Sequence, residues 1–128
     1  MLHYRLLILT FAAFLGGCMT PPTISSRPEA YLPVVEGKFR AADEAKMVDC
    51  IFDGFLDSQA APGSTLVRQT RREAGYRVAV AYGPTQLLVA DIRYTGDLVV
   101  TRLANSTFFN VDLELGVAKS CLAKYATK

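Results

Sequence analysis

The chain has 128 residues, 51% of them hydrophobic, and a formal net charge of +2. This length fits one small domain, and the apolar share is sufficient for a core. The nearly balanced charge lacks the basic excess of nucleic-acid-binding proteins and of polybasic proteins that lie on membranes. We therefore expect no nucleic-acid partner.

The first seventeen residues are typical of a removable signal peptide. Arg5 supplies one positive charge, residues 6–14 form a largely apolar run, and Leu15-Gly16-Gly17 leads directly to Cys18. The apolar run is too short to anchor a chain across a bilayer and has the length of a signal-peptide core. Because Arg5 is the only charged residue in this segment, its removal lowers the formal charge to +1.

Leu15-Gly16-Gly17-Cys18 resembles the lipobox of bacterial lipoproteins, which has an apolar residue and two small residues before the cysteine. The resemblance implies cleavage before Cys18 and acyl chains on that cysteine, which would hold the protein to a membrane. In such lipoproteins an aspartate after the cysteine tends to retain the protein at the inner membrane. Met19 occupies that position here, so we expect the periplasmic face of the outer membrane.

Residues 18–37 are predicted to be a lipidated cysteine followed by a tether, and residues 38–128 a small periplasmic domain. The tether contains Pro21, Pro22, Pro28 and Pro33. Proline removes a backbone donor and fixes φ, which disfavours helices and central strands. As a free linker, this stretch would reach roughly 25 Å as a coil and roughly 60 Å as a polyproline II helix. An alternative is that residues 31–35 dock on the domain as an edge strand.

The domain is predicted to be α+β, with a four-stranded antiparallel sheet and two helices on one of its faces. Apolar residues spaced three or four apart predict helices over 39–57 and 110–126. Runs rich in β-branched residues predict strands over 65–71, 76–82, 87–95 and 98–104. The order is therefore α-β-β-β-β-α, and its short connections favour antiparallel pairing. Asn110 is the expected N-cap of the second helix.

The turn residues predict strand registers. Gly96-Asp97 is expected to form a two-residue type II′ turn, which would place Asp91 opposite Arg102. One sheet face would then carry Leu87 and Val89 together with the apolar residues of the neighbouring strands, and both faces would be partly apolar. Since two helices cover one face only, the other is either a partner surface or lies beneath the docked linker. The candidate interaction face consists of Tyr76, Val78, Val80, Tyr82, Arg93 and Arg102.

Cys50 and Cys121 lie in the two predicted helices. In an exported protein two such cysteines usually form a disulfide, so we predict that this bond joins the helices. Gly54 lies one turn after Cys50 and would permit the close approach that the bond requires.

The residues expected to remain after cleavage offer little catalytic equipment. The only histidine, His3, is in the signal segment, which excludes histidine-based catalysis and histidine metal sites from the rest of the chain. Asp49, Asp53 and Asp57 could form an acidic ridge with Asp43. An exposed ridge lacks the contrasting environments of an acid/base pair, so it is interpreted as a solvated helix face. We expect no metal, no cofactor and no enzymatic activity.

The sequence therefore favours a lipid-anchored, non-enzymatic interaction module of the cell envelope that binds a protein partner or a second copy of itself. One alternative is a small inhibitor or exclusion lipoprotein, which a prophage or plasmid could carry, acting through residues 60–64. Another is a carrier of a small apolar ligand held between sheet and helices.

Overall fold

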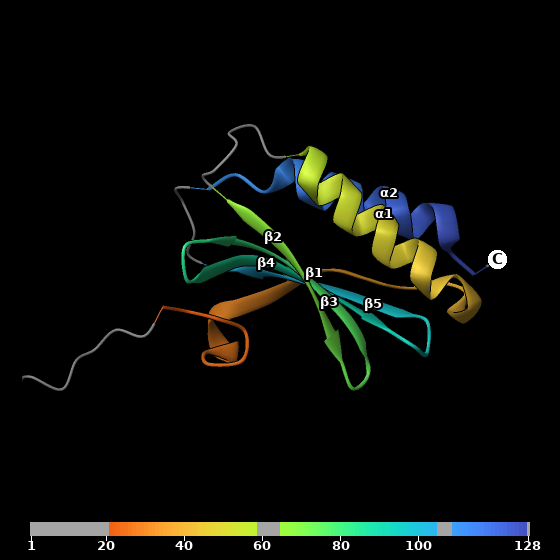
Figure 1. Ribbon diagram of the computed structural model, residues 1–128, viewed down its shortest axis with the longest axis horizontal. Coiled ribbons are helices and arrows are strands. Elements are labelled where there is room, and N and C mark those ends of the chain that lie inside the picture. Colours follow the sequence, from red (N-terminus) through yellow and green to blue (C-terminus); the bar gives the residue numbers. More distant parts are fainter. Residues whose placement is uncertain (1–20, 59–64, 105–108, 128) are drawn as a thin grey trace, which may run out of the picture.

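The computed structural model describes residues 21–58, 65–104 and 109–127. These residues form two layers, an antiparallel sheet and a pair of helices that lie side by side on one face of it (Figure 1). The elements are β1 (Tyr31–Lys38), α1 (Glu44–Asp57), β2 (Leu66–Arg72), β3 (Gly75–Tyr82), β4 (Thr85–Arg93), β5 (Asp97–Leu103) and α2 (Asp112–Tyr125).

The α+β architecture and the position of both helices on one face confirm the prediction, but the described sheet has five strands rather than four. Its order is β1-β5-β4-β3-β2, with every neighbouring pair antiparallel. The four predicted strands lie within two residues of their expected bounds. The fifth strand, β1, comes from the proline-containing stretch assigned to the tether.

β1 forms at the edge of the sheet, where a proline is tolerated because one side of the strand needs no hydrogen-bonded partner. Pro33 pairs with Thr101 of β5, and the register shifts between Pro33 and Val35. Pairing continues beyond the strand, because the Ala104 amide donates to the Ala30 carbonyl oxygen at 2.8 Å. The edge-strand alternative for residues 31–35 is therefore the one observed.

Both helices start slightly later than predicted. α1 begins at Glu44 because Phe39 pairs with Ala126 and residues 41–43 form a short 3₁₀ turn. The N-cap of α2 is Val111 rather than the predicted Asn110, whose side chain, one residue earlier, accepts a hydrogen bond from the Asp112 backbone amide at 2.8 Å.

The main core lies between the helices and the sheet. On α1 the buried side chains are Met47, Val48, Ile51 and Phe55. Ala45 is exposed and Met47 is buried, so the buried face of α1 is turned towards α2. These side chains pack on a sheet face that includes Val78, Leu88, Ala90, Ile92 and Val100, all of them completely buried.

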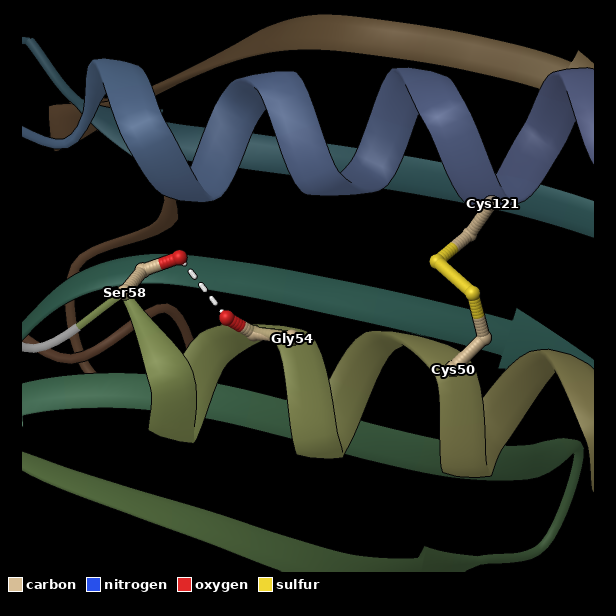
Figure 2. The surroundings of a disulfide bond; sticks show 4 residues. All are labelled: Cys50, Gly54, Ser58 and Cys121. Carbon is tan, nitrogen blue, oxygen red and sulfur yellow. Dashed lines mark hydrogen bonds between the residues drawn. A yellow bond between two sulfur atoms is a disulfide. The ribbon is translucent and has the colours of Figure 1, made fainter.

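The predicted disulfide joins the two helices. The Cys50 and Cys121 sulfur atoms are 2.04 Å apart and the Cα atoms 6.0 Å apart, within the usual range for a disulfide. Figure 2 shows the bond crossing directly between α1 and α2, with Gly54 on the next turn of α1. A β-carbon on Gly54 would lie 2.2 Å from Val117 Cγ1 of α2. Gly54 therefore permits the close helix contact predicted for it.

A β-bulge in β4 reverses the predicted faces of that strand. Tyr82 pairs with Thr85 across a two-residue turn, and this register alone would place Leu87 opposite Val80. The structure instead pairs Val80 with Leu88, which leaves Leu87 as an extra residue. Such a bulge shifts the pleat by one residue and exchanges the two faces. Val89 therefore lies on the face opposite Val78 and Val80, whereas the prediction placed it on the same face as these two residues.

The predicted Gly96-Asp97 turn is also wrong. β4 ends at Arg93 and β5 starts at Asp97, so the connection has three residues, with Gly96 at a φ of 88°. Glycine at positive φ is the usual last residue of three-residue hairpin loops. The longer loop pairs Asp91 with Val99 and Leu88 with Arg102, so Asp91 and Arg102 are not opposite each other.

Candidate functional site

The sheet face opposite the helices carries a second, smaller core. Tyr31, Ala79 and Val89 are buried there, and the partly buried side chains of Ile24, Ala30 and Leu103 pack around them. Residues 21–30, called the docked segment below, supply Ile24 and Ala30. Figure 1 shows this segment, in orange, on the side of the sheet away from both helices. Part of the predicted linker thus covers part of the second sheet face. This is one of the two alternatives that the sequence left open for that face, the other being a partner surface.

Hydrogen bonds from Tyr31 and Gln86 hold the docked segment in place. The Tyr31 hydroxyl lies 2.7 Å from the Gln86 carbonyl oxygen and 2.9 Å from the Pro22 carbonyl oxygen, and it donates to this pair. The backbone amide of Gln86 also donates to the Pro22 carbonyl oxygen at 3.1 Å, and the side-chain oxygen of Gln86, Oε1, accepts from the backbone amide of Ile24 at 3.0 Å. These contacts fix residues 22–24 beside the β3–β4 turn.

We expect the Tyr31 hydroxyl to ionise at a higher pH than an ordinary tyrosine. Burial raises the pKa of Tyr31 from 10.0 to about 12, because the charged phenolate would lose its hydration. A raised pKa for an acid means that Tyr31 contributes its full stabilisation below pH 10 and loses it as the pH rises through about 12. Ultraviolet absorbance of tyrosinate should therefore show one late step, absent from Tyr31→Phe. Coincident curves above pH 10 would contradict the buried hydroxyl.

The predicted interaction face does not form one exposed surface. Val78 and Val80 are buried beneath the helices, and Tyr76 packs against the same core. Tyr82 is exposed and contacts the Phe109 ring, with centroids 4.6 Å apart. Arg93 is exposed but lies on the face opposite Tyr76. It pairs with Gly75, which precedes Tyr76 in β3, and successive residues of a strand point to opposite faces. Arg72 also pairs with Gly75 and therefore shares the face of Arg93. The prediction failed because it did not anticipate how completely the helices cover this face.

The remaining part of the open sheet face is rich in arginine. The pairings of β2, β3 and β4 place four arginines on the side of Ala79 and Val89, away from the helices. We call these residues the arginine face: Arg68, Arg72, Arg77 and Arg93. Arg77 makes two hydrogen bonds to Asp91, of 2.7 and 3.1 Å, whereas the other three side chains are exposed and none of them appears in an ion pair of the described residues.

Two hollows of about 490 Å³ each lie along the arginine face. One is at the β2–β3 turn and is lined by Arg72, Arg77 and Arg93 among others. The second is beside the docked segment and is lined by Arg68, Arg77 and Gln86 among others. Arg77 borders both hollows, so they adjoin along β2 and β3; Glu73 and Asp91 also line the first hollow, and Asp91 is paired with Arg77. Arg68, Arg72 and Arg77 share this face through the β2–β3 register, whereas Arg93 joins them because of the bulge at Leu87.

The carboxylates do not form a catalytic pair in the described residues. Asp49, Asp53 and Asp57 are exposed along α1. Asp43 is not part of this ridge, because it is buried and paired with Arg40 at 2.7 Å and Lys46 at 3.3 Å. Glu114 is the other buried acid, and burial, with a smaller effect of the nearby Asp112 charge, raises the pKa of its carboxyl group.

The described residues contain no cluster of three or more histidine, cysteine, aspartate or glutamate side chains that could hold a metal ion. Neither of the two described helices is long and apolar enough to cross a bilayer. Cys18 and residues 60–64, the loop on which the inhibitor alternative depends, lie outside the described residues.

Comparisons with known proteins give no relative, because no family model, curated protein or solved structure matches the chain.

Proposed function

We propose that the protein is a periplasmic lipoprotein, anchored through Cys18 to the outer membrane, whose domain binds a protein partner and catalyses no reaction. The observation that carries the anchor is the sequence Leu15-Gly16-Gly17-Cys18 after an apolar run. The disulfide between Cys50 and Cys121 supports export, since such bonds persist in oxidising compartments.

The arginine face supports the binding role. It presents three exposed arginines, Arg68, Arg72 and Arg93, on a sheet face that the helices leave open. Arginine is favoured at protein interfaces because its planar fork binds carboxylates with two parallel hydrogen bonds. The partner that this face suits is an acidic protein segment. A carrier of apolar ligands is less favoured, because buried side chains such as Ile51, Phe55 and Leu88 fill the space between helices and sheet.

The anchor is tested by growing cells with labelled palmitate. The wild-type protein should take up the label and fractionate with outer membranes, whereas Cys18→Ser should take up none because it lacks the acylated sulfur. Cys50→Ser is the matched control: it removes a cysteine outside the lipobox and should still be labelled. A wild-type protein without fatty acid would refute the lipoprotein assignment.

The binding role is tested in the same cells with a photo-crosslinking residue at Thr70, which lies between Arg68 and Arg72 on the arginine face. A single defined adduct should form and should be lost when both arginines are replaced by glutamate. A crosslinker at Lys119, exposed on α2, is the control and should give no such adduct. An adduct that survives the charge reversal would show that the arginines do not recognise the partner.

A further inference from the structure

The docked segment changes how far the domain can stand from its anchor. The sequence assigns about twenty residues to a tether, which would reach roughly 25 Å as a coil. The structure attaches Pro22 and Ile24 to Gln86 by backbone and side-chain hydrogen bonds. Only residues 19–21 then separate Cys18 from the first fixed point. Four residue steps span at most about 14 Å when fully extended.

We infer that, once Cys18 is acylated, the docked segment holds the domain against the lipid head groups by the end that carries the β3–β4 turn. This inference rests on the proposed anchoring of Cys18. The partner surface is the bilayer itself, and the residues nearest to it are those beside Pro22, namely Thr23, Gly83 and Pro84.

The connectivity of the sheet separates this end from the opposite one. The docked segment, the start of β1 and the β3–β4 turn lie together, whereas the β2–β3 and β4–β5 turns lie at the other end (Figure 1). β3 has eight residues, so the two ends are about 23 Å apart. A connection of at most about 14 Å between Cys18 and Pro22 therefore brings the end with the β3–β4 turn to the membrane and leaves the opposite end away from it. The hollow at the β2–β3 turn, lined by Arg72 and Arg93, belongs to the distant end.

Two tyrosines of similar exposure allow a matched test. Tyr82 adjoins the β3–β4 turn and is 48% exposed, and Tyr94 lies in the β4–β5 connection and is 42% exposed. The chain contains no tryptophan, so Tyr82→Trp and Tyr94→Trp each introduce a single fluorophore by a conservative exchange. Each full-length variant is expressed in a Gram-negative host, purified from membranes and reconstituted into phosphatidylcholine vesicles whose head groups carry a nitroxide quencher.

We expect the nitroxide to quench the fluorescence of Tyr82→Trp at least about twice as strongly as that of Tyr94→Trp, because only position 82 lies near the anchor. Insertion of about 15 glycine and serine residues between Thr20 and Pro21, with a reach of roughly 20 Å, should remove the difference. The double variant Tyr31→Phe, Gln86→Ala weakens the docking contacts, so it should also reduce the difference in quenching between the two tryptophan positions.

The outcomes separate this inference from the proposed anchor. Equal quenching of the two variants in protein that carries labelled fatty acid would contradict the inferred orientation of the domain but would still support the anchoring of Cys18. Stronger quenching of Tyr94→Trp would show that the opposite end faces the membrane. Protein without fatty acid would overturn the anchor and the inference with it.

Discussion

Replacing Cys50 with serine is expected to lower the Tm of the domain by more than about 10 °C. The disulfide joins positions 71 residues apart, and closing a loop of this length stabilises a fold by roughly 4 kcal/mol through the entropy of the unfolded chain. In a domain of about 100 residues each kcal/mol corresponds to several degrees. The measurement is thermal unfolding followed by circular dichroism.

The matched controls for this prediction use the other half of the bond. Cys121→Ser should lower the Tm by a similar amount, and the double variant should show little additional loss because the bond is already absent. A reducing agent should bring the parent protein close to the variants. Two reactive thiols in periplasmically produced Cys18→Ser protein, where only Cys50 and Cys121 remain, would show that the bond does not form.

Replacing Gly54 with alanine is expected to destabilise the domain by about 1–3 kcal/mol, as overpacking of a core does. An exchange of glycine for alanine inside a helix normally stabilises by up to about 1 kcal/mol. At Gly54, however, the added methyl group would lie 2.2 Å from Val117 Cγ1 and 3.1 Å from Val117 Cγ2. Rotating Val117 so that its Hβ points at the new atom relieves the contact only at a cost, because valine in a helix strongly prefers one χ1 rotamer. Chemical denaturation gives the change in the free energy of unfolding.

Gly116 provides the control for the intrinsic effect of the exchange. It lies in α2, is exposed, and has no atom within 4 Å of the place that a β-carbon would occupy. Gly116→Ala should therefore be neutral or stabilising, and Gly54→Ala combined with Val117→Ala should recover part of the loss. If Gly54→Ala were as stable as Gly116→Ala, the helices would be farther apart than the structure has them.

Local patterns predicted the elements of this fold better than their registers. The spacing of apolar residues predicted both helices, and the Cys50–Cys121 bond was predicted from the expected export and from the positions of the two cysteines in these helices. β1 was not predicted as a strand because it contains Pro33. Proline is disfavoured in central strands but tolerated in edge strands, and residue propensity alone does not distinguish the two. An edge strand is decided by tertiary packing, here the pairing with β5 and the burial of Tyr31.

The candidate site depended on the registers and was therefore predicted poorly. The bulge at Leu87 and the three-residue loop ending at Gly96 each shift a strand by an odd number of residues, which exchanges its faces. Gly96 fits a three-residue loop as well as the predicted two-residue turn, and no turn residue marks the bulge at Leu87. The bulge brings Leu88, Ala90 and Ile92 to the core face beside Val78 and Val80, and it brings Arg93 to the open face beside Arg72.

The bond between Cys50 and Cys121 closes a covalent ring that contains β2, β3, β4 and β5, together with parts of both helices. β1 and the docked segment lie outside this ring. Separation of β1 from β5 would therefore leave the ring closed. If Cys18 is anchored as proposed, a force applied through that anchor would reach the docked segment and β1 before the cross-linked part of the domain.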